Sequence, residues 1–252
     1  GRPVNLDEIN KIAKKYNLLV IEDACQALGG VYKGKNIGSI SDFTTFSFHP
    51  VKNITTGEGG AVLTNNEEYY KEMKKFVSHG IGKDDLTKER YGDWYFEQMD
   101  LGLNYRLTDF QCALGLNQLK KIDIFLKKRK KIVSRYNKAF RNIDEIIIPQ
   151  EDAEDVQSAW HLYVRRLSGL LKDKRREVFD SFRKNGVGVQ VHHIPVCFHQ
   201  YYKKLDYKEG ACPNAESFYE SILSLPLYPD LSEEDQDYVI DNMRSVLIEL
   251  SK

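Results

Sequence analysis

The sequence predicts an α/β protein whose N-terminal part is built on a largely parallel, covered sheet. Two observations predict this fold class: helix-like and strand-like stretches alternate along the first part of the chain, and the first predicted strand, residues 18–21, is apolar at every position. A strand without polar alternation is expected to be buried on both faces, as in parallel sheets. It is followed directly by Glu22 and Asp23, and functional groups gather at the carboxyl ends of such strands.

The elements of the N-terminal part follow from periodicity, caps and turn residues. In order, we expect a helix over 6–16 ended by Asn17, strands over 18–21, 43–48 and 61–64, a small hairpin or a loop over 32–38, and a helix over 66–79 capped by Asn65 or Asn66. Residues 80–104 lack a periodic pattern, and a loop of this length is usually functional or part of an interface. A long helix is expected from its N-cap Thr108 to about Phe140.

After residue 142 the pattern changes to short strands and helices without a long parallel run, which predicts a small α+β domain. The expected elements are strands over 146–148, 159–167 and 187–193, and helices over 173–185, 214–221 and 233–250. We therefore expect two domains, 1–142 and 143–252.

Composition narrows the class of protein. The chain has 252 residues and a formal net charge of zero, which gives no electrostatic reason to expect nucleic acid or an anionic membrane as partner. No apolar run approaches the roughly 20 residues that span a bilayer. The four cysteines lack metal-site or disulfide spacing, so we expect a reducing cytoplasm, no metal site, and small buried apolar roles for Cys25, Cys112, Cys197 and Cys212.

Asp23 and Lys52 carry the most chemical information. Asp23 ends an apolar strand and needs a cationic partner, because an unpaired buried charge is costly. Lys52 follows a strand and precedes the glycine-rich segment 57–60, whose backbone lets a ligand approach closely. Lysines that form Schiff bases occupy such partly desolvated positions. An aspartate for a ring nitrogen and a lysine for a carbonyl carbon are what pyridoxal phosphate (PLP) chemistry requires.

Longer motifs resemble the DegT/StrS group of nucleotide-sugar aminotransferases. They are EDACQALG at 22–29, GS at 38–39, FSFHPVKNITTGEGG at 46–60, HG at 79–80, LGLNYRL at 101–107, QCALGLNQL at 111–119, AWHLY at 159–163 and LSLPLYP at 223–229. The resemblance implies a fold-type I, aspartate aminotransferase-like PLP enzyme. Residues 1–142 would form the C-terminal part of its large PLP-binding domain with a long linking helix, and 143–252 the small α+β domain.

The resemblance implies a role for each cofactor residue. Asp23 would pair with the pyridine nitrogen, Gln26 would lie near the ring hydroxyl, and Ser47 would hydrogen-bond the cofactor phosphate next to the substrate. Lys52 would form the Schiff base and then carry the proton of transamination. Asn104 would reach the neighbouring subunit's cofactor phosphate or substrate.

The substrate side follows from the same resemblance. Arg106 would also reach across a homodimer with shared active sites, and the segment Gln190, Val191, His192 and His193 would line the sugar site of the partner subunit. The two histidines could instead be polar residues at a strand end. Within the group, residues 190–196 and 49–52 most resemble transaminases of UDP-4-amino-4,6-dideoxy-N-acetyl-β-L-altrosamine, which serve the pathway to pseudaminic acid. We therefore expect amino transfer from glutamate to a UDP-linked 4-keto-6-deoxy amino sugar for surface polysaccharide synthesis.

Other readings of the chain stay open. Members of the group carry a further segment before the residues that match 1–3, so we expect this chain alone to bind PLP poorly and to be inactive. An inactive or scaffold-like fragment is therefore one alternative. A PLP-dependent sugar dehydratase is another, but histidine is typical there at the position of Lys52. An unrelated α/β domain would require Asp23, Ser47 and Lys52 to coincide by chance.

Overall fold

A computed structural model describes residues 1–82 and 89–250, which group into two compact units. The first unit comprises Gly1–Asp123 and Ala153–Ala159, and the second comprises Ile124–Asp152 and Trp160–Lys252. The helix α5 (Ile122–Phe140) therefore contributes nearly all of its length to the second unit. The expected domain boundary after residue 142 stays a prediction.

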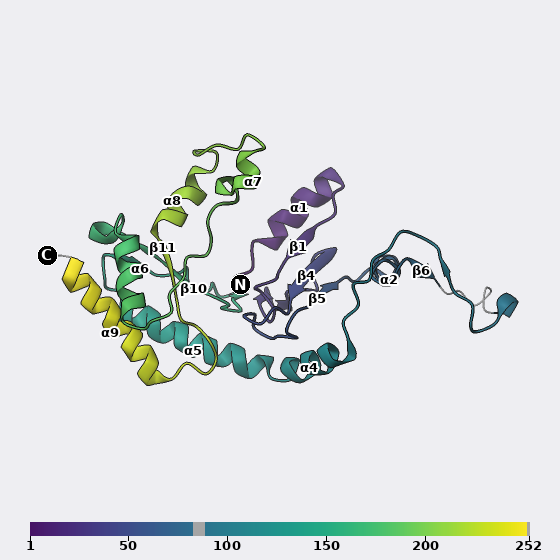
Figure 1. Ribbon diagram of the computed structural model, residues 1–252, viewed down its shortest axis with the longest axis horizontal. Helices are drawn as coiled ribbons and strands as arrows, with labels where there is room; N and C mark the ends of the chain where they lie inside the picture. Colours follow the sequence, from purple (N-terminus) through teal and green to yellow (C-terminus); the bar gives the residue numbers. More distant parts are fainter. Residues whose placement is uncertain (83–88, 251–252) are drawn as a thin grey trace. The chain divides into compact units, whose positions relative to one another are not determined.

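The central sheet of the first unit has the strand order β1–β4–β5 (Figure 1). Strand β1 (Ile21–Asp23) runs parallel to β4 (Phe43–Ser47), which confirms the expected parallel pairing of these two strands. Strand β5 (Gly60–Leu63) runs antiparallel to β4. It returns in this direction because residues 48–59 connect the two strands directly, without the crossover helix that a parallel pair needs.

Strand β1 differs from its prediction in position and in burial. It begins at Ile21, and Leu18, Leu19 and Ile21 are 59%, 58% and 71% exposed. The strand lies at the sheet edge, and β4 is its one neighbour among the strands of residues 1–82 and 89–250. The expectation of a strand over 18–21 buried on both faces was therefore wrong. An apolar stretch of sequence indicates that burying its side chains is favourable, but it does not identify the residues that would cover them.

The first two helices form where the sequence predicts them. Helix α1 (Leu6–Tyr16) ends at Asn17, whose φ of 52° lies in the left-handed region that asparagine tolerates. Helix α2 (Glu67–Phe76) begins after Asn66, whose side chain accepts two backbone amides of the first turn. It ends three residues before the expected terminus at residue 79.

The predicted hairpin forms from β2 (Val31–Tyr32) and β3 (Lys35–Asn36). Its two turn residues, Lys33 and Gly34, both have positive φ, as a tight hairpin turn of this length requires. Strand β9 (Val156–Gln157) pairs with β2 and was not predicted, because two residues are too few for a periodic pattern.

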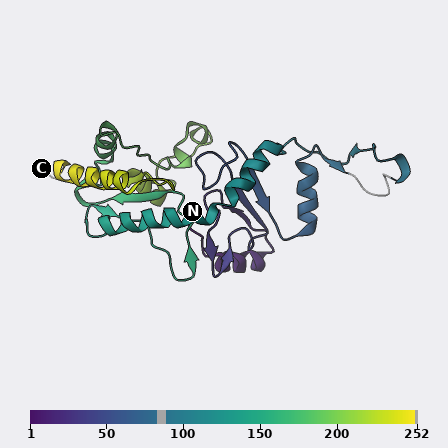
Figure 2. The ribbon, with the colours of Figure 1, turned by 90° about the horizontal axis from the view of Figure 1, so that it is seen from below.

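An arm follows helix α2, and the chain then returns to helix α4 (Asp109–Leu119), as Figures 1 and 2 show. In the arm, β6 (Ile81–Gly82) pairs antiparallel to β7 (Glu97–Gln98). Residues 83–88 of the expected irregular stretch lie outside the described residues. The single long helix expected over 108–140 is two helices, because the chain turns at Lys120 and Lys121 before α5 begins.

The second unit is built on an antiparallel sheet of order β11–β10–β8. Its elements are α5 (Ile122–Phe140), β8 (Ile146–Ile147), β10 (Tyr163–Leu167), η1 (Gly169–Leu171), α6 (Arg175–Lys184), η2 (Val196–Phe198), α7 (Gln200–Lys203), α8 (Pro213–Ser221), β11 (Ile222–Leu225) and α9 (Glu233–Leu250). One hydrophobic core joins α5, the sheet, α6 and α9. Within the described part of the chain, no helix combines the length and apolarity needed to cross a bilayer.

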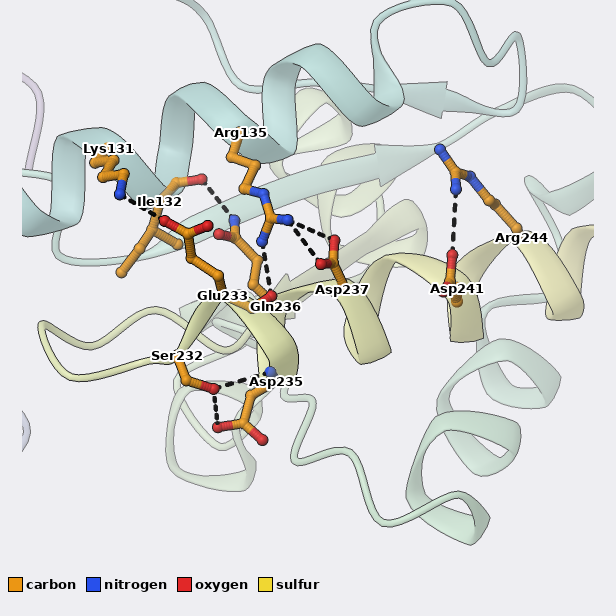
Figure 3. A network of polar contacts seen from close by, with 10 residues as sticks. All are labelled: Lys131, Ile132, Arg135, Ser232, Glu233, Asp235, Gln236, Asp237, Asp241 and Arg244. Carbon is orange, nitrogen blue, oxygen red and sulfur yellow. Dashed lines mark hydrogen bonds and ion pairs between the residues drawn. The ribbon is translucent and has the colours of Figure 1, made fainter.

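Polar contacts fix α9 against α5 (Figure 3). The Arg135 guanidinium donates to both carboxylate oxygens of Asp237 at 2.7 Å and to the Glu233 carbonyl oxygen at 2.7 Å. The buried Gln236 side chain donates to the Ile132 carbonyl oxygen at 2.8 Å. These contacts set the relative position of the two helices, because bidentate pairing restricts direction as well as distance.

The strand expected over 187–193 does not form. Only Gln190 pairs with the sheet in this segment, through an isolated bridge to Ser224 of β11. The Val189 amide donates to the Val187 carbonyl oxygen at 3.1 Å, and such a tight turn bends the chain out of an extended course.

Arg165 is a charged residue in the core of the second unit. It is 1% exposed, its Nη1 contacts Met243 Sδ at 3.3 Å, and its guanidinium lies 5.6 and 5.9 Å from the ring centres of Phe140 and Phe182. Its Nε and Nη2 have no hydrogen-bond partner among the described residues. Burial lowers the pKa of Arg165 to about 9, so the side chain is still charged at neutral pH. Ring contacts offset little of the hydration that it loses.

Replacing Arg165 by methionine is expected to raise the free energy of unfolding by about 1–4 kcal/mol, because an apolar side chain of similar volume removes an uncompensated buried charge. Urea denaturation of both proteins at neutral pH measures the change. Arg166→Met is the matched control on the same strand, since that guanidinium donates to Ser221 Oγ at 3.2 Å and should not be a source of instability. A lower unfolding free energy for Arg165→Met would contradict the expectation.

Candidate active site

The parallel pairing of β1 and β4 brings two predicted site residues to one edge of the sheet. Asp23 ends β1, and Ser47 ends β4. In a parallel pair the carboxyl ends of both strands lie at the same edge. Lys52 follows Ser47 by five positions, in the loop that leaves the same end of β4.

Asp23 is held in its ionised form. Its Oδ1 accepts the Cys25 amide at 3.1 Å, and hydrogen bonds from the Cys25 thiol and amide, followed by the charge of Lys52, lower the pKa of Asp23. The carboxylate is exposed, whereas its apolar sequence neighbours suggested that it would be buried. An ionised carboxylate at this position can pair with a cationic group of a ligand.

Lys52 lies half-buried in the loop between β4 and β5. Its amide donates to the His49 carbonyl oxygen at 2.9 Å, which closes a turn around the lysine. The next residue, Asn53, is buried, and its Nδ2 donates to the Ala159 carbonyl oxygen at 3.0 Å and to the Leu28 carbonyl oxygen at 3.4 Å. The loop is therefore anchored immediately beside Lys52.

Two further predicted residues lie along the same chain segments. Ser47 is half-buried, and its hydroxyl accepts the His49 amide at 3.4 Å. Gln26 is half-buried three residues after Asp23, in the turn that follows β1.

The remaining predicted residues lie elsewhere in the chain. Asn104 forms a bridge with Ser78 at the base of the arm, and Arg106 Nη1 donates to Ser78 Oγ at 3.0 Å. Both predicted residues are exposed. They belong to the first unit, and these contacts join them to Ser78 rather than to strands β1 and β4.

The segment from Gln190 to His193 belongs to the second unit. His192 Nδ1 lies 2.8 Å from Ser224 Oγ, and the Gln190 and Ser224 backbones exchange two hydrogen bonds at 3.2 and 2.7 Å. Val191 is half-buried, and His193 is exposed with its ring 4.6 Å from that of His192. Strand β11 therefore fixes the start of this segment.

Cys25 has a polar role that sequence reasoning missed. Its Sγ lies 3.9 Å from Thr45 Oγ1, and its amide donates to Asp23 Oδ1 at 3.1 Å. Burial, then the hydrogen bond to Asp23, raises the pKa of Cys25, whereas the charge of Lys52 lowers it. The expectation of buried cysteines was also wrong for Cys112 and Cys212, which are exposed. A cysteine two residues after a strand-end aspartate was the available signal.

The opposite effects of two neighbours on Cys25 give a testable pair of changes. Asp23→Asn is expected to lower the pKa of Cys25, because it removes a negative charge and its hydrogen bond, and Lys52→Met is expected to raise it. The pH dependence of iodoacetamide alkylation, resolved by peptide mass spectrometry, measures both shifts. Exposed Cys112 provides the internal reference. Shifts of the same sign in both variants would refute this account of the site.

Comparison with known proteins adds relatives of similar sequence. The chain is 44% identical to the UDP-4-amino-4,6-dideoxy-N-acetyl-β-L-altrosamine transaminase of Campylobacter jejuni, over 100% of this chain and 65% of that protein. It is 40% identical to the spore coat polysaccharide biosynthesis protein SpsC of Bacillus subtilis, over 98% of this chain and 64% of that protein. The chain thus spans about 65% of the length of curated relatives that it matches.

Solved structures with similar folds include Helicobacter pylori PseC, an aminotransferase of pseudoaminic acid biosynthesis, with a TM-score of 0.90 and 31% identity over 98% of this chain and 64% of that one. A protein named a sugar aminotransferase, Spr1654 of Streptococcus pneumoniae in its PLP form, has a TM-score of 0.88 and 32% identity over 98% and 66%. These likenesses confirm the expected α/β fold class. The model of the DegT/DnrJ/EryC1/StrS aminotransferase family matches residues 1–244, and the chain therefore belongs to this family.

Proposed function

We propose that the protein is a PLP-dependent aminotransferase that moves an amino group from glutamate to a UDP-linked 4-keto-6-deoxy amino sugar. The observation that carries the proposal is the parallel pairing of β1 and β4, which brings Asp23 and Ser47 to one edge of the sheet, with Lys52 in the loop that follows β4. The relatives named as altrosamine transaminases support the sugar class and a place in surface polysaccharide synthesis.

The residues at this edge fit PLP. The ionised Asp23 carboxylate suits a protonated ring nitrogen, and Lys52 supplies an amine for covalent attachment. Asn53 Oδ1 is buried without a hydrogen-bond partner among the described residues, so the loop next to Lys52 still holds an acceptor that a donor could satisfy. Ser47 and Gln26 would serve the phosphate and the ring hydroxyl.

PLP, when bound, supplies an electron sink for moving an amino group between two carbonyl carbons. The protein residues do the remaining work. Asp23, held ionised by Cys25, would keep the ring nitrogen protonated. Lys52 Nζ, once free of the cofactor, would take a proton from one carbon and return it to another, which a long and flexible side chain on an anchored loop allows. Asn53 fixes the base of that side chain.

We extend the proposal to the assembly and to the sugar. Asn104 and Arg106 would reach the cofactor phosphate or substrate of a second copy, and residues 190–193 would contact the sugar. Helix α4 supports a homodimer, because none of its residues is buried and Phe110 is 91% exposed. Exposed apolar patches of this kind mark protein interfaces. Free thiols at all four cysteines fit a reducing cytoplasm.

Lys52 provides the direct test of the function. The test uses a protein that includes the segment expected before residues 1–3. After incubation with PLP and reduction with borohydride, peptide mass spectrometry should find the pyridoxyl group on Lys52 in the unsubstituted protein and not in Lys52→Ala. Transfer from glutamate to a panel of UDP-4-keto sugars should fall at least about 100-fold in Lys52→Ala, because general acid–base catalysis alone contributes about 10²–10⁴-fold. Lys35→Ala, an exposed lysine of β3, is the matched control. Undiminished transfer by Lys52→Ala would eliminate the proposal.

The dimer can be tested on helix α4. Phe110→Asp and Leu116→Asp should each weaken self-association, because a buried apolar side chain contributes about 1.5–3 kcal/mol and a twofold interface counts each change twice. Light scattering over a concentration series measures the mass. Leu170→Asp, an equally exposed leucine of the second unit, should leave the mass unchanged. Equal masses for all four proteins would count against α4 as the interface.

A further inference from the structure

The loop that carries Lys52 is closed by its own backbone. The Phe48 amide donates to the Gly59 carbonyl oxygen at 2.8 Å, and the Phe48 carbonyl oxygen accepts the Thr56 amide at 2.9 Å. These two bonds join the first and last residues of the loop, and they leave Lys52 in the part between. The position of residues 56–59, which close the loop, therefore influences where Lys52 lies.

One side chain of helix α4 bonds the outer end of this loop. Gln111 Nε2 donates to the Glu58 carbonyl oxygen at 2.9 Å, and Thr56 Oγ1 donates to the same oxygen at 2.7 Å. Gln111 is also the third helical residue of a capping box. Its Oε1 accepts the Thr108 amide at 3.0 Å, while Thr108 Oγ1 accepts the Gln111 amide at 3.3 Å.

Close packing accompanies these bonds. Gly59 has a φ of 148°, and a Cβ on it would lie 2.5 Å from Thr56 Oγ1 and 2.8 Å from Leu107 Cδ2. A Cβ on Gly115 would lie 2.9 Å from Thr56 Cγ2. The loop therefore contacts the residue before the helix cap and the second turn of α4, with no room for a side chain at either glycine.

We propose that Gln111 is a positioning residue for Lys52. Its amide group joins two structures: the oxygen completes the cap of α4, and the nitrogen holds the Glu58 carbonyl and with it the end of the Lys52 loop. The proposal rests on the function proposed above, in which Lys52 holds the cofactor. It adds that the reactivity of Lys52 depends on a side chain of α4 that does not touch cofactor or substrate.

The two halves of the Gln111 amide can be separated by mutation. Glutamate is an equally good capping-box residue, so Gln111→Glu keeps the acceptor for Thr108 but loses the donor to Glu58. Its negative charge also repels the Glu58 carbonyl oxygen. Gln111→Ala removes both halves. Gln157→Glu, at the exposed residue of β9, makes the same chemical change in the same unit and is the matched control.

Amide hydrogen exchange and lysine labelling together test the proposal. In Gln111→Glu, exchange in peptides that cover residues 48–59 should accelerate about fivefold or more, while exchange in α4 stays unchanged, because one hydrogen bond of the loop is lost and the cap is kept. In the same variants of the protein that includes the segment expected before residues 1–3, labelling of Lys52 by limiting PLP and borohydride should fall by a similar factor relative to the other lysines. Gln111→Ala should show both effects and faster exchange in α4, and Gln157→Glu should show none.

Two outcomes would overturn the positioning role. One is unchanged loop exchange in both Gln111 variants, and the other is faster loop exchange with unchanged labelling of Lys52. The unsubstituted protein separates this question from the proposed function. If its Lys52 is labelled, the function stands and the variants decide the role of Gln111; if other lysines are labelled instead, the function itself fails.

Discussion

The parallel pairing of β1 with β4 is the constraint on which the candidate site depends. It places Asp23 opposite Thr45, and the ladder continues one residue further through the Ala24 amide and the Thr45 carbonyl oxygen at 3.0 Å. A slip of one residue would turn Asp23 to the other face of the sheet. Register thus decides on which face of the sheet the Asp23 carboxylate lies. The direct return to β5 then makes the lysine loop short enough to be closed by its own backbone.

A second constraint is that backbone carbonyl oxygens in loops need hydrogen-bond donors when no neighbouring strand provides an amide. In both units a side chain from a distant part of the sequence donates these hydrogen bonds. Asn53 reaches the Ala159 carbonyl, and Gln111 reaches that of Glu58. In the second unit the buried Arg129 guanidinium donates to three carbonyls, those of Trp160, His161 and Leu227 at 3.2, 3.1 and 3.0 Å. Asn53 and Gln111 belong to the family motifs themselves, whereas Arg129 lies outside them.

Local chemistry explains which features were predictable. Asn17 and Asn66 end and begin helices through conformations and hydrogen bonds that involve only near neighbours, so the sequence shows them directly. Thr108 was found as a cap for the same reason. The segment 187–193 was misjudged because its valine-rich composition favours a strand, while a turn over residues 187–189 precedes a single bridge at Gln190. The strand propensity of these residues was overridden there by the turn in the backbone.

The sequence by itself determined the alternation of helices and strands, the caps, and the residue types Asp23 and Lys52 at chemically meaningful positions. The tertiary structure alone decided that β5 runs antiparallel and that β1 lies at an edge. It also decided that Gln111 bonds Glu58 across 53 positions. Such partners are chosen by folding in three dimensions, and contacts between distant residues leave no periodic pattern along the chain from which they could be predicted.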